Sequence, residues 1–127
     1  MIEINEETMN ALMVFAGVAL GGGSGSVLRM LVGQWRGKTS TVGILLANTF
    51  ASAIVAYVVV WDHDWHWAAI AAGFAGGLST FSTWAAQTAE LWAADKRTDA
   101  INNALLNLLL PVFAVVAVLL PRLFGAF

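Results

Sequence analysis

The sequence has no cysteine and little charge. The absence of cysteine among its 127 residues excludes disulfide bonds, thiol chemistry and cysteine-based metal sites. Only 11% of the residues are charged, well below the roughly 25% of an average soluble domain. The six lysines and arginines form no basic patch, so nothing points to a nucleic-acid partner. Hydrophobic residues make up 59% of the chain, which is typical of a protein surrounded by membrane lipid.

Four apolar stretches are each long enough to span a membrane, which takes about 20 residues of helix. They cover residues 9–32, 42–61, 67–92 and 101–124. Little else remains, so we predict an all-α membrane protein in which residues 1–127 form a single domain of four transmembrane helices. The first residues carry Glu3, Glu6 and Glu7 and do not form the basic start of a signal peptide.

The third stretch contains a polar segment, residues 73–84, with the sequence GFAGGLSTFSTW. Its three glycines and four hydroxyl residues are unfavourable in hydrocarbon, where every unsatisfied backbone group is costly. Such a segment is retained where it packs against protein or borders a water-filled path. Phe81 and Trp84 are three residues apart, so both rings can face one pathway, although simple packing also explains such a pair.

Polar residues also occur in the first two stretches. Residues 21–26 are rich in glycine and serine and precede Arg29, a pattern that close helix packing and a snorkelling arginine would explain. Asn48 and Ser52 lie four residues apart and therefore share one helix face. A lone asparagine of this kind usually forms an interhelical hydrogen bond.

The fourth stretch has Asn103 and Asn107 on one face, followed by Pro111. Proline has no backbone N–H, so it cannot donate to the carbonyl group of Asn107. Two asparagines beside an interrupted hydrogen-bond ladder favour a polar track over a pure packing seam. Amide and hydroxyl hydrogens, together with the positive edges of aromatic rings, suit a small anion.

We do not expect an enzyme. The predicted spans contain no carboxylate except Glu90, and no Ser-His-Asp arrangement is apparent. His63 and His66 lie in the second connection, where a solvated loop is favoured over a surface metal site.

The basic residues are distributed unevenly between the two sides of the membrane. Five of the six belong to the first and third connections or the helix end before them, and these are Arg29, Arg36, Lys38, Lys96 and Arg97. Only Arg122 lies on the other side. The positive-inside rule then predicts cytoplasmic first and third connections, with both termini outside.

Four motifs together resemble those of the small fluoride channel family known as Fluc or CrcB. Residues 21–29 (GGGSGSVLR) are similar to the glycine-rich end of the family's first helix, with its arginine. Residues 43–48 (GILLAN) resemble the second-helix pattern that ends in the pore asparagine. Residues 73–84 resemble the third-helix signature, and Asn103 with Asn107 falls where the family has polar residues on its fourth helix.

The resemblance implies two antiparallel subunits in the cell inner (plasma) membrane, a broken third helix and passive export of fluoride that lowers its toxicity. A structural sodium ion would bind the backbone carbonyls of Gly76 and Ser79. The implied fluoride pathway consists of Asn48, Thr80, Phe81, Thr83, Trp84, Asn103 and Asn107. Structural roles would fall to Arg29, Gly77 and Gln87.

Three positions depart from the family pattern. Trp84 replaces the usual second phenylalanine, Gln87 replaces a common glutamate, and Pro111 replaces a small or hydroxyl residue. These changes leave open a non-conducting scaffold or partner subunit. The charge imbalance raises the further hypothesis of a heterodimer with an oppositely oriented paralogue. A small proton-coupled multidrug exporter is the third alternative, but it needs a carboxylate in the first helix, and residues 13–25 contain none.

Overall fold

The computed structural model describes residues 5–34, 40–61 and 64–125, and these form five α-helices without strands. The helices are α1 (Glu6–Gln34), α2 (Thr41–Val60), α3 (Trp65–Leu78), α4 (Phe81–Ala93) and α5 (Arg97–Leu123). Within the described residues, only α1, α2 and α5 are long and apolar enough to cross a membrane. In the region of the third expected span, residues 67–92, the chain has two short helices, α3 of 14 residues and α4 of 13 residues.

Polar side chains fix the start of three helices. Ser40 accepts a hydrogen bond from the N–H of Gly43 at the start of α2, and Asp64 accepts from the N–H of His66 at the start of α3. Thr80 does the same for α4 by accepting from Thr83. Such caps satisfy backbone donors that have no partner inside the helix.

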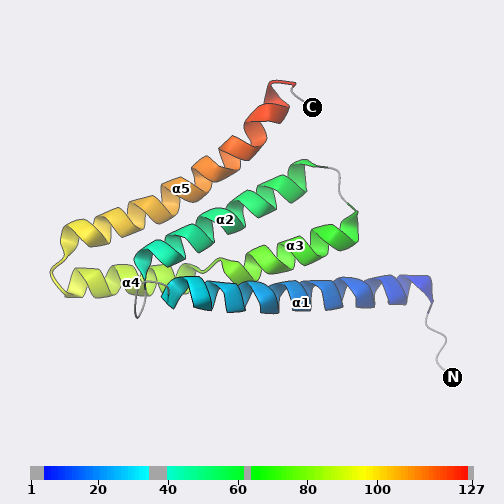
Figure 1. The fold of residues 1–127 in the computed structure, drawn as a ribbon, viewed down its shortest axis with the longest axis horizontal. Coiled ribbons are helices and arrows are strands. Elements are labelled where there is room, and N and C mark those ends of the chain that lie inside the picture. Colours follow the sequence, from blue (N-terminus) through cyan, green and yellow to red (C-terminus); the bar gives the residue numbers. More distant parts are fainter. Residues whose placement is uncertain (1–4, 35–39, 62–63, 126–127) are drawn as a thin grey trace.

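The helices lie roughly side by side, with α2 between α3 and α5 (Figure 1). α1 packs mainly against α3, whereas α5 packs against α2 and α4. The start of α1 and the end of α5 lie toward the same side of the view, and the α4–α5 turn lies at the opposite side. α1, α2, the pair α3 and α4, and α5 follow one another in the same order as the four apolar stretches of the sequence.

Glycines allow the backbones of α1 and α3 to touch. A Cβ atom added to Gly21 would overlap the carbonyl oxygen of Ile70, and one added to Gly77 would overlap that of Gly22. The close helix packing predicted for the first glycine-rich segment is therefore confirmed. Small residues stabilise helix pairs in this way within membranes, where apolar side chains gain little from leaving lipid.

The molecule has a small core and an apolar exterior. Ala47, Ala51, Ala75 and Leu78 form the buried cluster, with Ile54 and Phe74 packed against it. Large apolar residues such as Phe15, Leu20 and Val59 are about three-quarters exposed, at 74%, 75% and 78%. An exposed apolar surface of this extent is expected for a protein that lies in lipid or binds another membrane subunit.

Candidate functional site

Two extended residues, Ser79 and Thr80, separate α3 from α4. Asn48 of α2 binds both backbone groups of Thr80. The Thr80 N–H donates to Asn48 Oδ1 at 2.8 Å, and Asn48 Nδ2 donates to the Thr80 carbonyl at 3.3 Å. Asn48 is 9% exposed and Thr80 8%. We call these two residues between α3 and α4 the break. The Asn48 side chain supplies the backbone of Thr80 with the hydrogen-bond partners that a continuous helix would have supplied, and buried backbone groups need such partners.

The Thr80 hydroxyl group organises the first turn of α4. It accepts from the N–H of Thr83 at 3.2 Å and donates to Thr83 Oγ1 at 3.1 Å. A further bond joins it to Ser82 Oγ at 3.3 Å. The three hydroxyl groups thus share one hydrogen-bonded cluster at the start of the helix.

The other side of the break is bound by α1. Arg29 Nη1 donates to the carbonyl of Ser79 at 3.1 Å, and Ser26 Oγ donates to the carbonyl of Gly77 at 3.4 Å. Arg29 therefore does not snorkel away from the helices but binds the break directly. The carbonyl of Gly76 loses its usual helical donor, because the Thr80 N–H points to Asn48 instead.

A chain of side-chain hydrogen bonds runs from the break into α5 and back to α4. Asn48 Nδ2 donates to Asn107 Oδ1 at 3.0 Å, and Asn107 Nδ2 donates to Asn103 Oδ1 at 3.1 Å. Asn103 Nδ2 then donates to Thr88 Oγ1 at 2.9 Å. We call these residues, from Thr80 through Asn48, Asn107 and Asn103 to Thr88, the polar track. Because its bonds share one direction, they polarise one another.

Phe81 and Trp84 contact each other at the start of α4. Their ring centres lie 5.2 Å apart and their planes meet at 84°, an edge-to-face arrangement. The indole Nε1 of Trp84 also donates to the Asn103 carbonyl at 3.1 Å, which attaches Trp84 to α5. Phe81 is 73% exposed. The two rings predicted to face one pathway are together, but Phe81 lies on the outer surface of this chain.

Gln87 is the least exposed polar side chain of α4, at 3%. Neither Nε2 nor Oε1 has a hydrogen-bond partner in the described part of the chain. The sequence analysis assigns this residue only a structural role. Its position four residues after Thr83 is the one available signal that it shares a face with the hydroxyl cluster.

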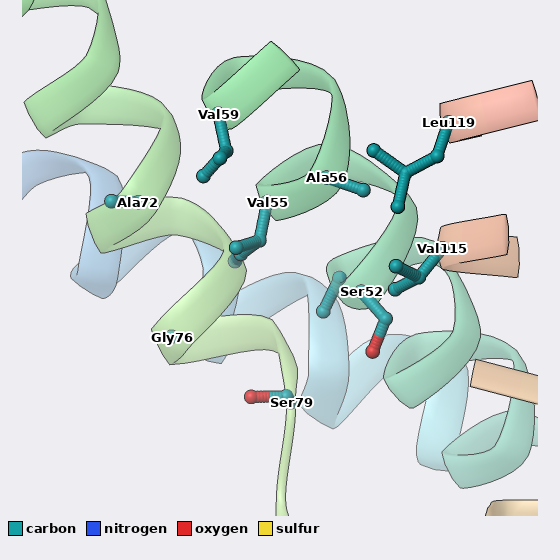
Figure 2. A pocket seen from close by; sticks show the side chains of 11 residues that line it. Ser52, Val55, Ala56, Val59, Ala72, Gly76, Ser79, Val115 and Leu119 are labelled. Atoms are coloured by element: carbon teal, nitrogen blue, oxygen red, sulfur yellow. The ribbon is translucent and has the colours of Figure 1, made fainter. Parts of the chain in front are cut away.

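An open groove of about 460 Å³ lies between α2, α3 and α5 (Figure 2). Ser52, Gly76 and Ser79 line it together with apolar residues. The two residues of the expected sodium site therefore face this groove, while the polar track lies elsewhere. A Cβ atom added to Gly76 would meet nothing within 4 Å, so space is available beside it.

Backbone oxygens at this groove suit a hard cation such as sodium. The Gly76 carbonyl does not accept the hydrogen bond that the Thr80 N–H would donate in a continuous helix. The Ser79 carbonyl already accepts one from the charged Arg29 side chain. A carbonyl oxygen has two lone pairs, so Ser79 retains one acceptor position. These two carbonyl oxygens, of Gly76 and Ser79, fit a sodium ion in chemistry.

In the described part of the second connection, Asp64 pairs with His66. Asp64 Oδ1 lies 2.8 Å from His66 Nδ1, and the described residues hold no group of three His, Cys, Asp or Glu side chains suited to a metal. Hydrogen bonds from the His66 backbone and then from its ring lower the pKa of Asp64. His63, Arg36 and Lys38 lie outside the described residues.

Known proteins are similar to this chain over most of its length. Residues 16–119 match the family described as CrcB-like protein, Camphor Resistance (CrcB). The chain belongs to the CrcB family. A protein from Klebsiella pneumoniae (strain 342) named "Fluoride-specific ion channel FluC" is 36% identical over 110 residues, covering 80% of this chain and 86% of the relative.

Two further relatives come from other organisms. A protein of the same name from Pyrococcus furiosus is 33% identical over 106 residues, covering 77% of this chain and 86% of the relative. Another from Salmonella arizonae is 33% identical over 108 residues, with 77% and 84% covered. No solved structure matches the chain. The resemblance inferred from the four motifs is thus confirmed at the level of the family.

Proposed function

We propose that this chain is a subunit of a fluoride-specific ion channel that exports fluoride passively from the cell. The observation that carries the proposal is its membership of a family whose relatives are named fluoride-specific channels. The buried polar track supports it, because neutral N–H and O–H groups beside a helix break can replace part of the water around a small anion.

The proposed fluoride pathway follows the hydroxyl cluster and the polar track. Thr80 and Thr83 supply hydroxyl groups, and Asn48, Asn107 and Asn103 supply amides. Phe81 and Trp84 present ring surface at the start of α4. Neutral donors bind an anion without holding it as strongly as a buried cation would, which allows the ion to leave.

In this proposal, α3 and α4 form one interrupted membrane span. Each is shorter than the about 20 residues that a span needs, but together they are long enough. A second subunit then covers the exposed Phe81 and the groove beside Gly76 and Ser79, with opposite orientation in the membrane. Four carbonyl oxygens, two from each subunit, would surround a sodium ion.

Sodium would offset the partial negative charge of the carbonyl groups at the C-terminal end of α3. This role is testable without measuring ion flux. The thermal unfolding temperature of the dimer in detergent should fall when sodium chloride is replaced by N-methylglucamine chloride. Equal unfolding temperatures in the two salts would remove sodium from the proposal.

The orientation of the chain decides between a homodimer and a heterodimer. The uneven distribution of lysine and arginine supports one fixed orientation, with both termini outside, and an oppositely oriented paralogue as partner. A topology reporter on the C-terminus measures this in cells. Equal populations on both sides would support the homodimer instead.

The test of function is ion efflux from liposomes containing the purified chain, alone and with a paralogue where one is encoded. Fluoride efflux without chloride efflux supports the channel. A lack of fluoride efflux in every combination would support the second candidate, a non-conducting scaffold. That candidate is based on the three departures from the family pattern, Trp84, Gln87 and Pro111. The exporter is disfavoured by family membership and by the absence of carboxylates from residues 13–25.

A further inference from the structure

Arg29 is a partly buried cation that makes no ion pair with a carboxylate in the part of the chain that the structure describes. The acidic residues of its own helix, Glu6 and Glu7, belong to the first turn of α1. At 1.5 Å of helix per residue they lie roughly 33 Å or more away along the axis. The positive charge of Arg29 is therefore balanced by something other than an ion-paired carboxylate.

The partner of Arg29 is the carbonyl group of Ser79, to which Nη1 donates at 3.1 Å. This carbonyl lies at the C-terminal end of α3, where the aligned backbone dipoles leave a partial negative charge. A cation is favourable at such an end. The chain thus supplies one positive charge of its own, from α1, to the break between α3 and α4.

The proposed sodium ion would bind at the same end of α3, through carbonyl groups that differ in their hydrogen bonds. The Gly76 carbonyl lacks its helical donor, because the Thr80 N–H donates to Asn48. The Ser79 carbonyl accepts from the guanidinium group of Arg29. Sodium would therefore receive one oxygen without its helical donor and share the other oxygen with a fixed positive charge.

From this shared oxygen we infer that Arg29 sets the sodium affinity of the proposed site and keeps it low. The inference rests on the proposed function, since it concerns the sodium ion of the proposed dimer. Two effects act in the same direction. The guanidinium group uses one of the two acceptor positions of the Ser79 carbonyl, and its charge repels a second cation on that oxygen. Arg29 is thus a positioning residue that acts on the ion through Ser79.

The variant Arg29→Met tests this role, because methionine keeps an unbranched side chain but has neither a donor nor a charge. Arg29→Lys is the conservative variant, since it keeps the charge and a donor for a carbonyl oxygen. The matched control is Arg97→Met, the same change at an exposed arginine at the start of α5.

The thermal unfolding temperature of the dimer in detergent is measured against sodium concentration, with N-methylglucamine chloride keeping the ionic strength constant. An ion that binds only the folded protein raises this temperature once its concentration exceeds the dissociation constant. The sodium concentration at which the rise begins, which we call the onset, therefore reports the affinity. A donor with a purely structural role would not change the onset.

We expect the onset in Arg29→Met to lie about tenfold or more below that of the unmodified chain, because each subunit loses one positive charge beside the ion. Without sodium, its unfolding temperature should fall, because the Ser79 carbonyl loses its donor. Arg29→Lys and Arg97→Met should keep the onset of the unmodified chain. Arg29→Gln, which is also neutral, should show the same shift and replaces the methionine variant if that form does not fold.

An unchanged onset in the neutral variants would overturn the inference and leave Arg29 as a structural donor. An onset at higher sodium concentration would also overturn it, since Arg29 would then help the site to hold the ion. An equal shift in Arg97→Met would attribute the effect to net charge alone.

The proposed function fails in a different way. Equal unfolding temperatures of the unmodified chain in the two salts would remove the sodium site, and this inference with it. A lack of fluoride efflux in every combination would refute the channel, whatever the onset.

Discussion

Replacing Asn48 with alanine should destabilise the protein more than any other change of one polar residue in α2. The asparagine makes three hydrogen bonds, at 2.8, 3.0 and 3.3 Å, and two of them satisfy the backbone of Thr80 at the break. Thr80 is only 8% exposed, so water does not replace the lost partner. Both backbone groups of Thr80 would therefore remain buried and unpaired.

Two limits bracket the magnitude. Leaving two buried groups unpaired costs about 1–3 kcal/mol each, which gives about 2–6 kcal/mol. Interhelical hydrogen bonds in membrane proteins average about 0.6 kcal/mol, so three of them give about 2 kcal/mol. We expect a loss of about 2–4 kcal/mol in the free energy of unfolding, from the membrane average to the middle of the range for two unpaired groups.

The assay is unfolding in detergent micelles by added SDS, followed by tryptophan fluorescence. The control is Thr49→Ala in the same helix, because the Thr49 hydroxyl donates only to Leu45 of its own helix, at 2.7 Å. That change should cost less than about 0.5 kcal/mol. A loss below about 1 kcal/mol for Asn48→Ala, or a loss equal to the control's, would refute the view that Asn48 satisfies the break.

Three further predictions follow from the contacts of α3 and α4. Gly77→Ala should lower the free energy of unfolding by about 1–3 kcal/mol in the same assay, because its Cβ would overlap the backbone of α1. Gly76→Ala is the control, because its Cβ meets no such overlap. An equal loss for both variants would contradict the packing of α1 against α3. Trp84→Phe removes the bond to Asn103 and part of the ring, so fluoride efflux from liposomes should rise; unchanged efflux would show that the indole does not restrict the path. The pKa of Asp64 is lowered in the folded protein, so its stabilising effect is present above the ordinary pKa of about 3.9 and is lost as pH falls through the lowered value. Asp64→Ala should therefore weaken the acid dependence of unfolding, measured between pH 6 and pH 3, and an unaltered dependence would contradict this.

The sequence predicts most of the helices because each depends on a long apolar run. The runs that contain α1, α2 and α5 are long enough to cross the hydrocarbon core of a membrane, and segments with charged residues bound them. Asn103 and Asn107 were predicted to share a face, and they do lie in one hydrogen-bonded track. The spacing of four residues along a helix is sufficient to predict that Asn103 and Asn107 share a face.

The partners of these residues were not predictable in the same way. Nothing in the sequence indicates that Asn48 would pair with Thr80, 32 positions away, or that Arg29 would bind the Ser79 carbonyl. Both contacts depend on how α1, α2 and the break are placed in space. The unpaired state of Gln87 is likewise invisible in the sequence, because it results from the burial of α4 against its neighbours.

The track bonds also bear on how fluoride could move. Every amide of the track donates to a neutral oxygen, and an anion is a stronger acceptor than such an oxygen, since charge-assisted hydrogen bonds are roughly twice as strong. In the proposed channel, an arriving fluoride takes over a donor while the displaced amide oxygen loses only a modest bond. When the ion leaves, the internal bond forms again, so no donor stays unpaired in the low-dielectric interior. Binding strength is thus limited by the bond that must be broken, which favours passage of the ion over its retention.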